Sequence, residues 1–290
     1  MHRRTLLTSL AVTPLLARAA HAAGTFVETR DGQRLFYKDV GNGRPVVFIH
    51  GWTLSSAIWT LQTDWLAAQG LRAIAYDRRG HGDSSKPQDG YDYDTLAADL
   101  AAVLDRLDLQ DVVLVGHSMG AGEVVRYLAR YGSRRIARVV FAAPMTPYAL
   151  KTSDNPEGTD PQIYDKILAA VTANRQAYLA AGTPAFLGRN VEPEMVDWAM
   201  SIALQAAPQA QIECIRAFAT TDFRPQMRAV TMPTLIAYGT ADVPSIAVNA
   251  RRTQAAIAGS RLEIYEGAPH ALFITERERF NRDLLAFARS

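Results

Sequence analysis

Residues 112–132, "VVLVGHSMGAGEVVRYLARYG", contain the strongest single indication of how this chain folds. Four apolar residues lead into a GHSMG segment at 116–120, and a helical pattern of apolar residues begins directly afterwards. This order is typical of a buried strand that turns sharply into a helix. The serine at the turn, Ser118, is either a small residue needed for packing or a nucleophile held out of the sheet.

Strands and helices alternate on both sides of this segment. Two strands, 25–30 and 34–40, are joined at Asp31-Gly32, which is a hairpin signal. Buried apolar strands that alternate with helices indicate an α/β fold with a mostly parallel sheet covered on both faces. The further expected strands are 45–49, 71–77, 111–115, 136–143, 232–239 and 261–266, and the expected helices are 57–69, 92–107, 119–131, 246–257 and 275–288.

The alternation breaks between about 144 and 225, where the sequence is mostly helical and rich in proline, aromatic residues and methionine. This segment is too small for an independent domain. We therefore predict one domain over 24–290, with 144–225 as an inserted helical cap. Because open parallel sheets bind ligands at the carboxyl ends of their strands, the cap is expected to lie over the site.

The first 23 residues predict a signal peptide. They begin with Arg3-Arg4, continue with a mildly apolar run over 5–17, and end in small residues around 20–22. The paired arginines favour a twin-arginine-type signal and export to the periplasm or the medium. A disordered or amphipathic extension is the alternative.

Charge and composition exclude several classes of partner. The chain has 31 Lys+Arg against 29 Asp+Glu, and part of the basic excess belongs to the predicted signal peptide. No nucleic-acid partner is indicated, and no apolar run is long enough to predict a membrane span. A single cysteine, Cys214, cannot form an internal disulfide. The sequence is compatible with a homo-oligomer.

Three polar residues follow expected strands in the order serine, aspartate, histidine. Ser118 follows the strand at 111–115, Asp242 follows 232–239, and His270 follows 261–266. A serine hydroxyl becomes a good nucleophile when a neighbouring base takes its proton. Histidine titrates near neutrality, and an aspartate can hold its ring in the required tautomer. Asp222 is a competing acid, but it precedes a strand and is interpreted as structural.

The segment "VVFIHGWTLSSAIW", residues 46–59, predicts the second part of this machinery. Trp52 comes directly after His50-Gly51, at the end of an apolar strand. We expect its backbone N–H and that of Met119 to form an oxyanion hole. The histidines show no H-x-x-x-H or H-E-x-x-H spacing, so no metal site is predicted.

Together these motifs resemble the α/β-hydrolase superfamily, and more narrowly the cofactor-free haloperoxidase and aryl esterase family. "AYDRRGHGDSS", "VLVGHSMGAGEVVRY", "TDF", "YGTAD" and "YEGAPHALF" occur in that family's order and spacing. The resemblance implies an eight-stranded, mostly parallel sheet, the Ser118-Asp242-His270 triad, the oxyanion hole named above and no cofactor. It also implies an apolar pocket under the cap, for which the candidates are Trp52, Thr53, Phe186, Trp198, Phe218 and Val243.

Two positions depart from the family pattern. Many haloperoxidase-type members have proline after the H-G-W or H-G-F segment, where this chain has Thr53. In this chain Pro244 also follows closely after Asp242, whereas D-x-x-x-P is common in the family. We therefore predict a serine hydrolase that cleaves small carboxylic esters through an acyl-enzyme. A cofactor-free perhydrolase or haloperoxidase is the alternative, and a non-catalytic ligand-binding protein is disfavoured by the intact triad.

Overall fold

The computed structural model describes residues 25–188 and 191–290. The predicted signal peptide, residues 1–23, lies outside these described residues. An eight-stranded sheet of order β1-β2-β4-β3-β5-β6-β7-β8 forms the centre of the molecule. β1 and β2 run antiparallel to their neighbours, and the pairs from β4 to β8 are parallel. The strands are β1 Thr25–Glu28, β2 Arg34–Gly41, β3 Pro45–Ile49, β4 Arg72–Tyr76, β5 Val112–His117, β6 Ile136–Ala142, β7 Thr234–Gly239 and β8 Arg261–Tyr265.

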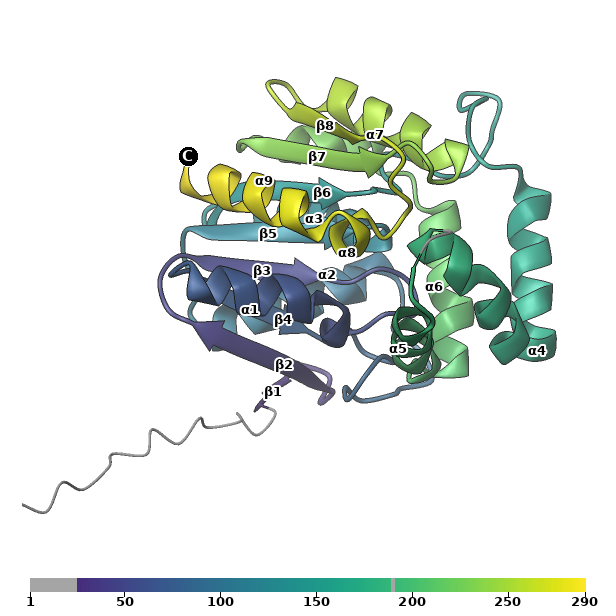
Figure 1. Cartoon of the computed structure of the whole chain (residues 1–290), viewed down its shortest axis with the longest axis horizontal. Helices are drawn as coiled ribbons and strands as arrows, with labels where there is room; N and C mark the ends of the chain where they lie inside the picture. The colour runs from purple at the N-terminus through teal and green to yellow at the C-terminus, as the bar shows by residue number, and fades with distance from the viewer. Residues whose placement is uncertain (1–24, 189–190) are drawn as a thin grey trace, which may run out of the picture.

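Helices cover both faces of the sheet. In Figure 1, α1 and α9 lie in front of the strands, and α2 and α3 lie behind them. The Asp92 carboxylate begins α2 by accepting hydrogen bonds from the N–H groups of Asp94 and Thr95. These helices are η1 Ser56–Trp59, α1 Thr60–Ala68, α2 Tyr93–Arg106, α3 Met119–Tyr131, α7 Pro244–Ala256, α8 Leu272–Thr275 and α9 Arg277–Arg289.

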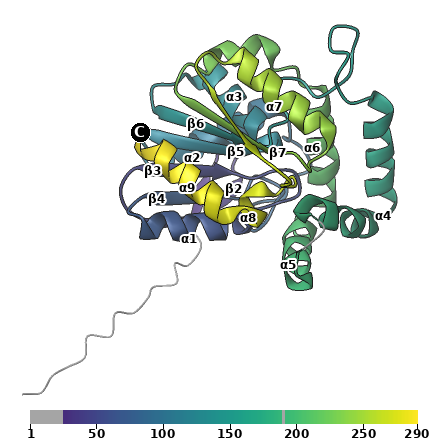
Figure 2. The same cartoon turned by 45° about the horizontal axis from the view of Figure 1, so that its top comes forward.

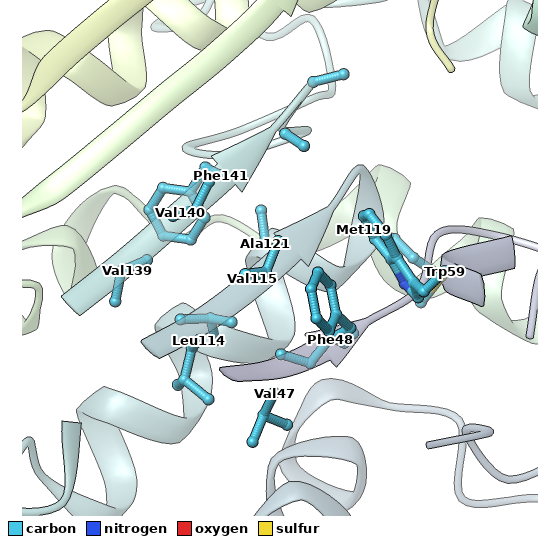
Figure 3. Close-up of a cluster of buried hydrophobic side chains, with 14 of the residues drawn as sticks. Val47, Phe48, Trp59, Leu114, Val115, Met119, Ala121, Val139, Val140 and Phe141 are labelled. Atoms are coloured by element: carbon cyan, nitrogen blue, oxygen red, sulfur yellow. The ribbon is translucent and has the colours of Figure 1, made fainter. Parts of the chain in front are cut away.

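The hydrophobic core is centred on β3, β5 and β6. Figure 3 shows side chains of these strands gathered with Met119 and Ala121 of α3. Phe48 of β3 packs against Trp59, with ring centroids 5.0 Å apart. Every residue of β5 is buried, because helices cover it on both faces, and residues 112–115 are therefore continuously apolar rather than alternating.

Three helices occupy the interval between β6 and β7. They are α4 Pro161–Leu187, α5 Pro193–Leu204 and α6 Pro208–Thr220, and the short η2 Arg224–Ala229 follows them. Each of the three begins with a proline, whose fixed φ and missing N–H suit the first turn of a helix. The three lie beyond the arrowheads of the central strands, at the carboxyl edge of the sheet (Figures 1 and 2).

The predicted fold class is confirmed, with strand positions that agree to within two residues at both ends of every strand. The helix predicted at 275–288 corresponds to α9, and one additional short helix, α8, precedes it. The helix predicted at 57–69 begins with a 3-10 turn, capped by Ser55. Among residues 25–188 and 191–290, no helix is both long and apolar enough to cross a bilayer.

Candidate active site

Ser118 occupies a strained turn between β5 and α3. Its φ is +55° and its ψ is −118°, in a sparsely populated region that costs a non-glycine residue roughly 1–3 kcal/mol. The neighbouring glycines leave no space for the turn to relax. A Cβ added at Gly120 would lie 2.7 Å from the Ile49 carbonyl oxygen, and one at Gly116 would lie 2.8 Å from the Gly120 carbonyl oxygen. The packing therefore holds the serine in this conformation.

Asp242 and His270 are paired at the same edge of the sheet. Asp242 lies in the loop after β7 and His270 in the loop after β8, and their Oδ2 and Nδ1 atoms are 2.6 Å apart. The Asp242 side chain is 2% exposed, whereas that of His270 is 21% exposed. Since the ring donates its Nδ1–H to the carboxylate, its Nε2 is left available to another group. The loops after three separate strands thus bring Ser118, Asp242 and His270 to the wall of one cavity.

This cavity has a volume of about 780 Å³ and lies between the sheet edge and helices α4–α6. Its size falls within the range of about 300–1,000 Å³ that is usual for small-molecule sites. Five of the six predicted pocket residues line it: Trp52, Thr53, Phe186, Phe218 and Val243.

The sixth prediction, Trp198, is wrong, because this residue is not among those that line the cavity. On α5 the cavity is lined by Ala199 and Ala203, which are four residues apart and therefore share one helical face. Trp198 is turned about 100° from Ala199 and is half-buried against the core instead. Small residues at helical spacing were the sequence pattern that could have predicted the cavity-facing side of α5, whereas the size of the tryptophan was misleading.

Sequence reasoning also missed Tyr178 of α4. This side chain lines the cavity and packs edge-on against Trp52, with ring centroids 6.2 Å apart. The Trp52 indole N–H donates to the Gln211 carbonyl of α6 at 2.9 Å. Trp52 therefore connects the loop after β3 to two helices of the 144–225 segment. A contact of this kind joins residues that are far apart in the chain, so no local sequence pattern predicts it.

The two predicted oxyanion donors lie at backbone positions suited to that role. Met119 is the first residue of α3, so its N–H has no intrahelical acceptor. Trp52 is followed by Thr53, whose φ is +62°. Positive φ is unusual for a β-branched residue, and proline, fixed near −65°, cannot adopt it. The threonine that departs from the family pattern thus belongs to a loop conformation that proline would not allow.

His117 lies behind His270. Its ring is 4.7 Å from the His270 ring, and its Nε2 donates to the His270 carbonyl at 3.3 Å. Burial, followed by the neighbouring His270, lowers the pKa of His117 well below its usual value. His117 is therefore neutral, and it supports the His270 loop without placing a positive charge beside it.

The other residues considered as possible site residues have structural roles instead. Asp222, the competing acid, pairs with Arg224 at 2.7 Å. Cys214 is fully buried in α6, and burial raises its pKa to about 12, so it remains a thiol. Within the described parts of the chain, no group of three histidine, cysteine or carboxylate side chains could hold a metal ion.

Comparison with known proteins identifies the family. Residues 44–277 match the family model described as the alpha/beta hydrolase fold. The chain belongs to the α/β-hydrolase family. This α/β hydrolase is 41% identical to a non-heme chloroperoxidase of Streptomyces lividans, over 91% of this chain and 99% of that protein. It is 37% identical to a bifunctional esterase/perhydrolase of Acinetobacter calcoaceticus, with the same two coverages.

A solved structure gives the same picture. An esterase from Exiguobacterium antarcticum superimposes with a TM-score of 0.90 and 30% identity, covering 92% of this chain and 100% of that one. The predicted resemblance to haloperoxidases and esterases is thereby confirmed. In this fold the parallel strands bring the loops that carry Ser118, Asp242 and His270 to one edge of the sheet, which is where the cavity lies.

Proposed function

We propose that this α/β hydrolase cleaves small carboxylic esters through an acyl-enzyme formed on Ser118. One observation carries the proposal: a serine held at positive φ in a strained turn shares a cavity with a histidine whose Nδ1 is hydrogen-bonded to a buried carboxylate. Relatives described as esterase and perhydrolase support the same chemistry. The cavity wall is largely apolar, which suits acyl and aryl groups without charge.

The proposed mechanism uses each group at a stated atom. His270 Nε2 takes the Ser118 hydroxyl proton as the oxygen attacks the ester carbonyl. The N–H groups of Trp52 and Met119 stabilise the negative oxygen of the tetrahedral intermediate. The alcohol leaves with the proton from His270, and Asp242 stabilises the imidazolium formed between these steps. Water then attacks the acyl-enzyme by the reverse proton path and releases the carboxylic acid.

A second function is perhydrolysis, which the named relatives favour. Here hydrogen peroxide replaces water in the second step, and the product is a peracid. The peracid oxidises halide in solution to hypohalous acid and is itself reduced to the carboxylic acid. The choice between the two functions depends on which nucleophile attacks the acyl-enzyme, and Thr53 lies on the loop where that difference can arise.

The test is a series of p-nitrophenyl esters from acetate to decanoate, measured with and without hydrogen peroxide and bromide. We expect hydrolysis of short and aromatic acyl groups to dominate, with a smaller yield of peracid. Ser118→Ala should lower kcat for both reactions by about 10⁴–10⁶. Ester turnover that survives Ser118→Ala would reject the proposal, and peracid as the main product would favour the second function.

We also propose that residues 1–23 direct export through the twin-arginine route. The basis is sequence alone: paired arginines, a mild apolar run and a small-residue cleavage site. Replacing Arg3-Arg4 by two lysines should leave uncleaved precursor inside the cell. Normal processing of that variant would instead favour the general secretory route.

A further inference from the structure

His50 lies at the end of β3 and is fully buried, one residue before the glycine that precedes Trp52. The backbone N–H of Arg78 donates to its Nε2 at 3.0 Å. A backbone N–H can only donate, so Nε2 is the bare nitrogen of the ring. In the neutral imidazole the proton is then on Nδ1, which lies 2.8 Å from the carbonyl oxygen of Gly51. Nδ1 therefore donates to Gly51. The guanidinium Nη1 of Arg78 also lies 3.3 Å from Nδ1, but it can only donate, so with the proton on Nδ1 this longer approach is a contact and not a hydrogen bond.

The Gly51 carbonyl and the Trp52 N–H belong to one peptide unit. This unit is planar and trans, so the two groups point in opposite directions. A hydrogen bond that holds the carbonyl on the buried side consequently aims the N–H the other way. Trp52 lines the cavity that contains Ser118, and its N–H is one of the two donors in the proposed mechanism.

The surroundings of His50 keep its ring neutral and fixed. The guanidinium of Arg78 donates from Nη2 to the His50 carbonyl at 2.8 Å and from Nε to Glu123 at 2.9 Å. Glu123 also accepts from the Tyr76 hydroxyl. Burial, together with the positive Arg78, lowers the pKa of His50 well below its usual value. The buried Arg78–Glu123 pair thus fixes the position of His50, and His50 in turn fixes the Gly51 carbonyl.

We propose that His50 is a positioning residue that sets the orientation of the Gly51–Trp52 peptide, and thereby the oxyanion donor of Trp52. The proposal rests on the function proposed above. Removing one oxyanion donor outright costs about 10²–10³ in kcat, so a donor that is only misaligned should cost less, about 10- to 100-fold. KM should change little, because the interaction develops in the transition state.

The experiment compares two side chains that replace different halves of the imidazole. Asn at position 50 can donate from near the Nδ1 position to Gly51, whereas Gln reaches the Nε2 position and can accept from Arg78. We expect His50→Asn to keep a kcat at least several-fold above that of His50→Gln, with His50→Ala the lowest. Turnover is expressed per serine labelled by an alkyl phosphonate, so that misfolded protein is not counted.

His81→Ala is the matched control. His81 is also fully buried, its ring lies 5.0 Å from that of His50, and its Nδ1 bonds the Arg79 carbonyl. Turnover per labelled serine should be normal in this variant. Equal turnover in His50→Asn and His50→Gln, or an equal loss in His81→Ala, would overturn the positioning role. Activity that survives Ser118→Ala would instead overturn the proposed function, so the two failures are distinguishable.

Discussion

The carboxyl edge of the sheet and the helices that cover it are built differently. At the sheet edge, Ser118 and Thr53 are buried residues held at positive φ, and the neighbouring histidines are fixed by hydrogen bonds. Across the cavity, α4 is largely exposed, and its helix is interrupted at Asn174. The chemistry is therefore placed on rigid, strained backbone, whereas the opposite wall is made by side-chain packing that substitution can alter more freely.

The largest effect that would sharpen this contrast is expected at Asp242. Replacing it with asparagine should lower kcat by about 10⁴, because the amide no longer holds His270 in the productive tautomer. Asp222→Asn is the matched control at the competing acid and should leave kcat within about twofold. Steady-state kinetics with p-nitrophenyl acetate and a thermal melt of each variant make the comparison. A normal kcat for Asp242→Asn would remove this residue from the site.

Acid should lower the folding stability of the molecule through buried groups of the sheet and its loops rather than through the 144–225 segment. His50, His81 and His117 are buried, and burial lowers the pKa of His81 to about 3 and holds the other two well below the usual value. Below about pH 6 the unfolded chain binds three protons that the folded chain does not. Burial raises the pKa of Asp99 to about 6 and also raises that of Asp77, so protonation of these two carboxyls in the folded state offsets one or two of them.

Folding stability should therefore fall as pH decreases from about 5.5 to 4.5, by about 1.4–2.7 kcal/mol per pH unit for one to two protons. Urea melts at half-unit pH steps measure this slope. The 144–225 segment contains no histidine, so no contribution of this kind is expected from it. A free energy of unfolding that stays constant over this range would show that the three rings are not neutral in the folded state.

A substitution in the helices that cover the cavity should have a smaller effect on kcat/KM, and one that depends on the length of the acyl chain. Ala203→Phe adds a ring to the cavity wall from α5 and should lower kcat/KM for decanoate about tenfold or more, while acetate changes little. Ser201→Phe, on the exposed face of the same helix, is the control and should leave the chain-length profile unchanged. Equal losses for acetate and decanoate in Ala203→Phe would show that this wall does not measure acyl length.

The smallest effect concerns the strain at Thr53. Glycine and alanine variants both lose the threonine hydroxyl and methyl groups, but glycine tolerates a φ of +62° without a Cβ clash, whereas alanine keeps the strain. Thr53→Gly should therefore unfold at higher urea than Thr53→Ala, by about 1 kcal/mol in the free energy of unfolding. Equal stabilities for the two variants would indicate that position 53 carries no backbone strain.

Much of this protein follows from local sequence. The fully apolar strand at 112–115, the glycines around Ser118 and the alternation of strands with helices determine the sheet, the sharp turn and the serine. The order of Ser118, Asp242 and His270 at successive strand ends was also readable, because parallel strands bring their carboxyl ends to one edge. These features depend on residues near one another in the chain or on a general rule of topology.

Only the tertiary structure decided which side chains face the cavity and how the oxyanion loop is held. Trp198 looked like a pocket residue by size, but the rotation of α5 presents Ala199 and Ala203 instead. The bonds between His50 and Arg78 and between Trp52 and Gln211 join segments that are 28 and 159 positions apart in the chain. Composition and periodicity indicate only whether a residue is buried. Which residues it contacts depends on how the packed helices and strands are rotated against one another.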